Sequence, residues 1–187
     1  MTLQLTLNST SKLEFAFGKI TTGKEMQLFG EYFPALTPLI EEHGCQQVGS
    51  FAVIASNTKS TAPEMGAFTQ WPSEENFKNF YSDPRFIKLK ALRDDSLDLL
   101  CDGHFFNPVD KVIDINTDDD YAIVISKEDP TGLKAMLNLP LEVNSPTQTY
   151  SGKSITLSLW DDNADNVLAA PSKEAEIFRV RFNAPTS

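Results

Sequence analysis

Two histidines and one glutamine are the groups of this sequence best suited to contact a small molecule. His43 precedes a glycine at the end of a predicted helix, where its imidazole could transfer protons or simply cap the helix. His104 stands in a short apolar strand, either as a ligand-binding group or as a histidine with an ordinary internal hydrogen bond. Gln70 also lies in an apolar strand, where an unpaired polar group costs roughly 1 to 3 kcal/mol. Its amide therefore needs a partner, which is either a ligand or a neighbouring group.

Aromatic and basic residues add further candidates without fixing a reaction. Tyr32 and Trp71 are amphipathic aromatics, which pack in cores and also form the walls of ligand cavities. Arg93 follows Leu92 on a predicted helix, and we expect it to pair with a neighbouring acid rather than with a substrate. The sequence shows no Ser/His/Asp motif, glycine-rich phosphate loop, metal-ligand spacing or dinucleotide fingerprint. We therefore predict no metal and no cofactor, and leave the catalytic residues unassigned.

Composition excludes several classes of protein. The chain has 187 residues, 41% of them hydrophobic, which is enough for a globular core and excludes disorder. With 16 Lys and Arg against 26 Asp and Glu, its net charge of −10 argues against a nucleic-acid partner. No apolar run approaches the ~18 residues of a membrane helix, and the start lacks the features of a signal peptide. We expect a cytoplasmic protein without a membrane partner, in which Cys45 and Cys101 are reduced.

Hydrophobic periodicity in the first half predicts the order βαββαβ. Residues 13–22 alternate between apolar and polar, as in a half-buried strand. Residues 24–43 have the apolar stripe of a helix, which either is kinked at its prolines, Pro34 and Pro38, or begins near Pro34. Strands over 45–56 and 65–71 follow, then two helical pieces that begin at Ser73 and Asp83 and carry apolar residues as far as Leu100. A short strand over 104–106 closes the unit. This order is the ferredoxin-like arrangement of an α+β protein, with two helices on one face of an antiparallel sheet.

The second half repeats the same order more weakly. We expect a strand over 121–126, a short helix over 130–139, two strands within 147–160, a second helix over 161–170 and a last strand over 174–182. The sequence is therefore divided into a ferredoxin-like unit over 1–110 and, over 111–187, either a second, smaller ferredoxin-like unit or an appended α/β segment.

A motif in the first unit resembles a known family. It reads W-P-S from Trp71, then three residues, then F-x-x-F-Y-S-D-P from Phe77, and Tyr32, Ala35, Pro38, His43-Gly44, Leu89 and Arg93 complete the pattern over about residues 32–106. This pattern is similar to that of a bacterial family of small dimeric α/β-barrel proteins labelled as a domain of unknown function. The family is similar in fold to cofactor-independent monooxygenases, isomerases and haem-degrading proteins. Two positions depart from the pattern: Cys45 replaces a glycine, and Gln70 replaces an acid that could serve as a base.

The resemblance implies a barrel of paired sheets, formed either by a homodimer or by an internal pseudo-dimer of the two halves. It also implies a ligand cavity on the sheet face that the helices leave uncovered, whose candidate residues are Ser50, Gln70 and His104, with Tyr32 or His43 at the rim and Trp71 as an aromatic wall. Our first functional hypothesis is a small-molecule-binding or interaction protein. A cofactor-independent monooxygenase or isomerase acting on a small apolar or aromatic metabolite is the alternative, and a haem-handling protein, resting on His104, is the third.

Overall fold

The computed structural model describes residues 1–58, 62–105, 110–127, 133–143, 150–160 and 175–184. Eleven strands occupy these residues: β1 (Thr2–Leu7), β2 (Lys12–Ile20), β3 (Gln46–Ser56), β4 (Met65–Trp71), β5 (Leu97–Phe105), β6 (Lys111–Asn116), β7 (Asp120–Ser126), β8 (Ala135–Pro140), β9 (Glu142–Val143), β10 (Ser154–Leu159) and β11 (Glu176–Phe182). The helical segments are α1 (Glu25–Gln27), the π-helical turn η1 (Leu28–Tyr32), α2 (Phe33–Glu42), α3 (Glu74–Tyr81) and α4 (Pro84–Ser96). The protein therefore has an α+β fold.

Strands β2 to β5 form a ferredoxin-like unit. Their order in the sheet is β3-β4-β2-β5, and every neighbouring pair is antiparallel. The chain from α1 to α2 joins β2 to β3, and α3 with α4 joins β4 to β5, so the order is βαββαβ. The predicted pairing of residues 45–56 with residues 65–71 is confirmed by the register Phe51 opposite Gly66.

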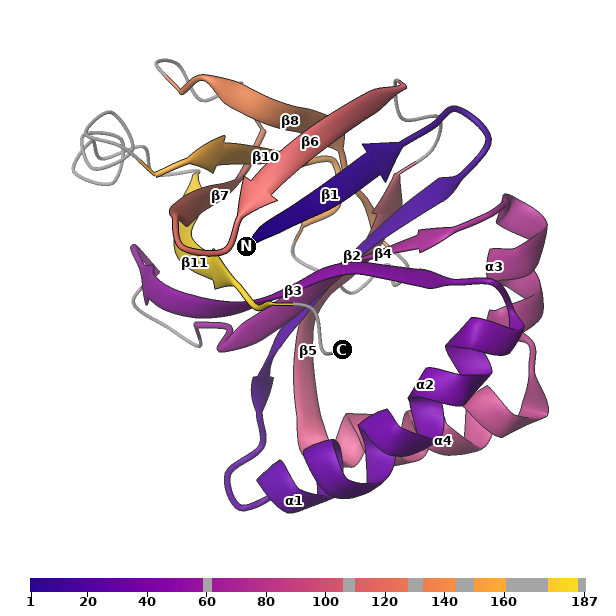
Figure 1. Cartoon of the computed structure of the whole chain (residues 1–187). Coiled ribbons are helices and arrows are strands. Elements are labelled where there is room, and N and C mark those ends of the chain that lie inside the picture. Colours follow the sequence, from indigo (N-terminus) through magenta and orange to yellow (C-terminus); the bar gives the residue numbers. More distant parts are fainter. Residues whose placement is uncertain (59–61, 106–109, 128–132, 144–149, 161–174, 185–187) are drawn as a thin grey trace.

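The strands of the second half continue the same sheet. Their order is β8-β10-β7-β11, which repeats the strand order of the first unit, and β11 pairs with β3. Only Leu141 separates β8 from β9, and β9 pairs with β5 at the far end of the sheet. The strand order thus returns to its starting point within one chain, and Figure 1 shows the strands curving around a common interior.

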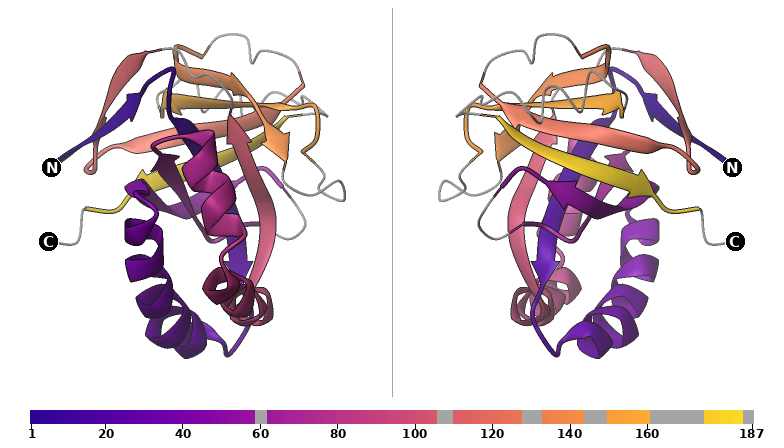
Figure 2. Two further views of the ribbon diagram at one scale, coloured as in Figure 1. Left: turned by 90° about the vertical axis from the view of Figure 1, so that its right-hand side faces the viewer. Right: turned by 90° about the vertical axis from the view of Figure 1, so that its left-hand side faces the viewer.

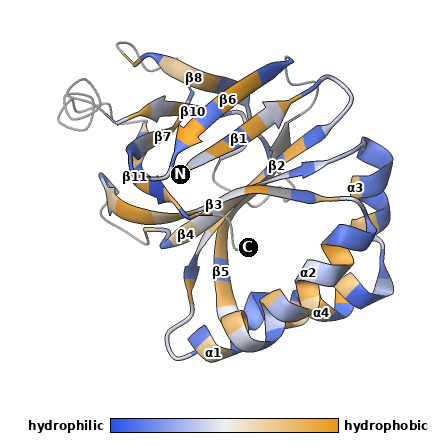
Figure 3. Ribbon diagram, viewed as in Figure 1, coloured by the Kyte–Doolittle hydropathy of each residue, from blue (hydrophilic) through white to orange (hydrophobic). Residues whose placement is uncertain are grey.

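Large apolar side chains from both halves fill this interior. The cluster includes Phe15, Phe17, Phe51 and Phe68 of the first half and Ile123, Ile125, Ile155, Leu157, Phe178 and Phe182 of the second, each at most 3% exposed. The two-stranded sheet of β1 and β6 adds Leu3, Leu5, Ile113 and Ile115 to the same cluster. Hydrophobic residues accordingly concentrate along the strands in Figure 3, whereas α3 is mostly hydrophilic.

The helices lie outside the barrel, against the strands of the first half. Figure 2 shows them on the side of the barrel that faces away from β7, β8 and β10. The predicted helix starts are confirmed. The side chain of Ser73 accepts a hydrogen bond from the backbone N–H of Asn76, and the side chain of Asp83 accepts one from the backbone N–H of Arg85. Gly44 follows the end of α2 with φ of 74°, a conformation that glycine adopts without strain.

Several sequence-based boundaries need correction. Residues 97–105 form a nine-residue strand rather than a helix end and a short strand, because they pair with β2 from Leu13 to Ile20. Residues 135–140 are strand β8, not part of a helix over 130–139, because their backbone pairs with β10. Strands β1 and β6 were not predicted. The helix expected over 161–170 falls outside the residues that the structure describes.

Candidate functional site

A cavity of about 190 Å³ lies between the helices and the outer face of the first unit's sheet. Its floor comes from alternate residues of neighbouring strands, which are Glu14, Ala16 and Gly18 of β2, Ser50 of β3, and Met65, Ala67, Thr69 and Trp71 of β4. Its walls come from the helices: Tyr32, Phe33, Leu36, Thr37 and Ile40 on one side, and Phe80, Tyr81, Phe86 and Arg93 on the other. The lining is therefore mainly apolar and rich in aromatic rings.

Small residues at one register explain why this space stays open. Ala67 lies opposite Ala16 on β2 and opposite Ser50 on β3. Three neighbouring strands thus present short side chains to the helices at the same level. Because the backbones of a helix and a sheet cannot approach closely enough to fill that gap, a cavity remains above these residues.

Glu14 is the buried acid at this floor. It is 8% exposed, and its carboxylate accepts hydrogen bonds from three side chains. The Trp71 indole Nε1 donates to Oε2 at 2.9 Å, the Thr69 hydroxyl donates to the same oxygen at 3.1 Å, and the Tyr81 hydroxyl donates to Oε1. These bonds join β2 to β4 and to α3, so they fix the carboxylate in position at the edge of the cavity.

Cys45 lies beside this carboxylate. Burial, reinforced by the negative charge of Glu14, raises the pKa of the Cys45 thiol to about 12. The thiol therefore stays protonated at neutral pH, and it behaves as an apolar part of the wall rather than as a nucleophile.

Arg93 brings a cation to the opposite wall. Its side chain is 11% exposed, and its Nη2 lies 2.8 Å from Asp94 Oδ1. Nε donates to the same oxygen at 2.9 Å, and the Asp94 side chain is 52% exposed. This confirms the predicted pairing of Arg93 with a neighbouring acid and directs part of the guanidinium toward the surface.

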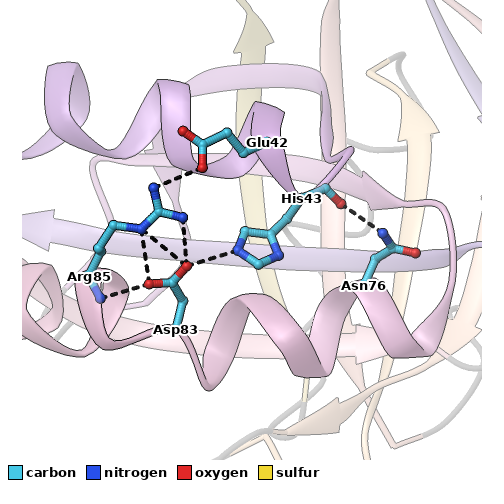
Figure 4. Close-up of polar contacts among 5 residues, drawn as sticks. All are labelled: Glu42, His43, Asn76, Asp83 and Arg85. Carbon is cyan, nitrogen blue, oxygen red and sulfur yellow. Dashed lines mark hydrogen bonds and ion pairs between the residues drawn. The ribbon is translucent and has the colours of Figure 1, made fainter.

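His43 belongs to a polar cluster at the end of the cavity walls, shown in Figure 4. Its Nε2 lies 3.1 Å from Asp83 Oδ2, and its backbone oxygen accepts a hydrogen bond from Asn76 Nδ2 at 3.1 Å. Arg85 bridges Asp83 and Glu42, with both ion pairs at 2.8 Å. The cluster links the end of α2 to the start of α4. It thereby fixes the distance between two helices that face each other across the cavity.

The cavity lies on the helix-covered face of the sheet, which differs from our expectation. The uncovered face lines the barrel interior, and large side chains from both halves fill it. Tyr32, Ser50 and Trp71 of the sequence-based candidates line the cavity, whereas His43 stands behind its wall, where its ring contacts Phe80.

Gln70 does not line this cavity, and the prediction for His104 is not tested. Gln70 lies on the strand face opposite that of Thr69 and Trp71. Its side-chain amide donates a hydrogen bond to Ser11 Oγ at 2.7 Å, so its partner is a neighbouring group of the protein, which was one of the two expected alternatives. The backbone of His104 pairs with Glu14 and Glu142, and its side chain is outside the described part of the chain.

Sequence reasoning missed Glu14, Thr69 and Tyr81. One signal was present: Glu14 alternates with Leu13 and Phe15, so it lies on the strand face opposite the apolar one. In a ferredoxin-like unit, one face of each strand is covered by helices, and an acid on that face becomes buried. The hydrogen-bond partners could not be found in this way, because they come from a separate strand and a separate helix.

Comparison with known proteins shows the fold alone. An anthrone oxidase-like protein aligns with a TM-score of 0.54 and 12% identity, covering 97% of this chain and 94% of its own. A variant of chlorite dismutase from Candidatus Nitrospira defluvii aligns with a TM-score of 0.51 and 10% identity, covering 96% and 93%. Both have the dimeric α/β-barrel fold. No family model and no curated protein matches the sequence.

Proposed function

We propose that this protein binds a small, mainly apolar molecule in the cavity between the helices and the sheet. The observation that carries the proposal is a cavity of about 190 Å³ whose lining is mostly aromatic and aliphatic, with the Glu14 carboxylate fixed at its floor. A cavity of about 150 Å³ in another protein holds benzene, so this one has room for a molecule with one or two rings. An apolar lining with few, well-placed polar groups is typical of ligand sites.

Catalysis on such a ligand is the second candidate. A carboxylate and a tyrosine hydroxyl that share a hydrogen bond at a largely apolar cavity can accept and return a proton, as an isomerase or a cofactor-independent monooxygenase requires. The fold likeness to an anthrone oxidase-like protein is in line with that chemistry and with a ring-containing ligand. Turnover of a bound ligand, followed by mass spectrometry, distinguishes this candidate from binding alone.

Filling the cavity tests the binding proposal. Ala67→Phe places a ring on the cavity floor, and we expect it to abolish binding of one- and two-ring compounds that the wild-type protein binds in a thermal-shift and calorimetric screen. Ala91→Phe, at an exposed position of α4, is the matched control and should leave binding unchanged. Binding that persists at full strength in a folded Ala67→Phe protein would contradict the proposal.

A further inference from the structure

Ser50 is the polar residue that the floor of the cavity presents at the level of Ala16 and Ala67. It is half-buried on β3, and β4 separates this strand from β2. Because neighbouring strands lie about 4.8 Å apart, Ser50 stands roughly 10 Å across the sheet from the strand that carries Glu14. The floor of the cavity therefore carries polar groups on two separate sides.

Asn183, from the second half of the chain, contacts Ser50 directly. Phe182 of β11 lies opposite Phe51 of β3, and both rings are buried in the barrel core. Since side chains alternate, the next residue, Asn183, lies on the helix-covered face beside Ser50. Its backbone N–H donates to the Ser50 backbone oxygen at 2.8 Å, and its side-chain Nδ2 donates to Ser50 Oγ at 2.9 Å. Two hydrogen bonds thus hold the Asn183 amide against the hydroxyl.

The Ser50 hydroxyl accepts a bond from this amide and keeps its own proton for another partner. No described residue accepts a hydrogen bond from it. Because an N–H group occupies the side of the oxygen that faces β11, the O–H bond is directed to the other side, toward β4 and the cavity. The Thr37 and Thr69 hydroxyls and the Trp71 indole, by contrast, donate to oxygens of the protein itself.

We infer that Ser50 donates a hydrogen bond to the ligand, and that the ligand is an apolar molecule with a neutral carbonyl oxygen at this end. Asn183 is a positioning residue, because it donates to Oγ and so leaves the hydroxyl proton for the ligand. A carbonyl oxygen regains in the cavity the hydrogen bond that it loses from water, whereas the net charge of −10 disfavours a carboxylate. The inference rests on the proposed function and specifies the polar group that the ligand carries.

Two probes of nearly equal shape test the inference: acetophenone, and α-methylstyrene, in which a methylene group replaces the carbonyl oxygen. Calorimetry or ligand-observed NMR gives their dissociation constants, and the quantity compared is the ratio of the two affinities in each protein. Comparing ratios between variants cancels the different hydration of the two probes. In Ser50→Ala we expect the ratio to shift about five- to tenfold against the ketone, because its carbonyl loses one hydrogen bond.

Asn183→Asp tests the positioning role while keeping the shape of the side chain. A carboxylate can only accept a hydrogen bond, so it takes the Ser50 proton, and we expect a similar shift against the ketone. Asn79→Asp, at an exposed position of α3, makes the same change in net charge and should keep the wild-type ratio. A merely structural role of Asn183 would weaken the binding of both probes alike and leave the ratio unchanged.

The outcomes separate this inference from the proposed function. If both probes bind the wild-type protein and their ratio is the same in Ser50→Ala, the inference is wrong and apolar binding stands. A ratio that shifts in Ser50→Ala but not in Asn183→Asp overturns the role assigned to Asn183. If neither probe binds the wild-type protein, the proposed function fails and the inference fails with it. The two variants change different residues, so the one that folds still decides the question.

Discussion

Glu14 connects three parts of the first unit through single hydrogen bonds. Its carboxylate on β2 accepts from Trp71 and Thr69 on β4 and from Tyr81 on α3. A group with this many partners stabilises the fold in addition to its proposed role at the ligand site, since its loss leaves buried donors without an acceptor. The two roles can be separated by comparing a truncating substitution with a conservative one.

We expect Glu14→Ala to lower the free energy of unfolding by at least about 2 kcal/mol, because the Trp71 and Tyr81 donors lose their acceptor. Glu14→Gln should cost about 1 kcal/mol, since the amide oxygen still accepts. Urea denaturation measures both. Glu75→Ala, at an exposed position, is the control and should stay within about 0.5 kcal/mol of wild type. Equal stability of Glu14→Ala and wild type would contradict this account.

Cys45 gives a prediction on reactivity and alkaline stability. Burial and Glu14 raise the pKa of its thiol to about 12, whereas a thiol in the unfolded chain has a pKa near 8.5. The stabilising contribution is therefore complete below about pH 8.5 and is lost as the pH rises toward 12. In a Cys101→Ser background, Cys45 should react with Ellman's reagent at pH 8 only after denaturant is added. Rapid reaction of the folded protein would show that the thiol is accessible.

The cluster around Asp83 predicts an acid effect. Hydrogen bonds from Arg85 and His43 hold the pKa of the Asp83 carboxyl well below its usual value. A group with a lowered pKa in the folded state stabilises the fold above its unfolded pKa, near 3.9, and less as the pH falls below it. Asp83→Asn should therefore lower the melting temperature at pH 7, and the difference from wild type should shrink below about pH 4. Asp94→Asn, on the exposed side of α4, offers a comparison; a pH-independent effect of Asp83→Asn would point to helix capping alone.

Among the elements, β4 packs closely on both of its faces. It lies between β2 and β3, its odd-numbered residues face the cavity, and Gly66 faces the barrel interior. A Cβ at Gly66 would meet the Phe51 ring, and it would lie 2.7 Å from both Ala16 O and Phe17 Cβ. The glycine therefore allows the aromatic core and the strand backbone to approach each other closely.

Gly66→Ala should destabilise the protein by about 2 to 3 kcal/mol or more, because the added methyl overlaps backbone as well as side chains. Gly30→Ala is an informative counterpart. It lies in η1, where a Cβ would meet only Met26 Cε at 3.8 Å, and it should stabilise the protein by about 0.5 to 1 kcal/mol. Chemical denaturation of both variants checks the pair. A tolerated alanine at position 66 would mean that β4 can shift, which this packing does not allow.

On the scale of the whole molecule, the two halves share one core. Phe17 and Phe178 come from different halves, and their ring centroids are 5.2 Å apart. Strand β11 pairs with β3 and β9 pairs with β5 in the large sheet, and β1 pairs with β6 in the two-stranded sheet, so strand pairings join the halves in both sheets. We propose that residues 1–110 and 111–187 are two ferredoxin-like units that form an internal pseudo-dimer, and that they fold as one cooperative body.

Cooperative unfolding of the two halves can be tested by destabilising the second half and following the unfolding of the first. Phe178→Ala removes a buried ring of the second half and should cost about 3 to 5 kcal/mol. In a Trp160→Phe background, the fluorescence of Trp71 in the first half should show that same loss, with a midpoint equal to that from circular dichroism. Light scattering at the same time reports whether a second copy is bound. A Trp71 transition unaffected by Phe178→Ala would indicate two independent domains.

The sequence by itself determined the first unit. Period-two alternation in residues 13–17, helix starts at Ser73 and Asp83, and the helix end at His43-Gly44 are local signals, because each depends on neighbouring residues or on the backbone of one turn. They were sufficient for the βαββαβ order. Tyr32, Ser50 and Trp71 were candidates for a cavity on the uncovered face, and they line the cavity that lies on the opposite, helix-covered face.

Only the tertiary structure decided where the cavity lies and what stands in it. Each strand face is apolar in places, so alternation alone could not tell which face is filled by the other half of the chain and which is left partly open under the helices. The Glu14 contacts join residues 55 to 67 positions apart, and the register of β2 against β4 brings Ala16 and Ala67 together. The packing of the whole barrel sets this long-range register, so it cannot be predicted from a local sequence pattern.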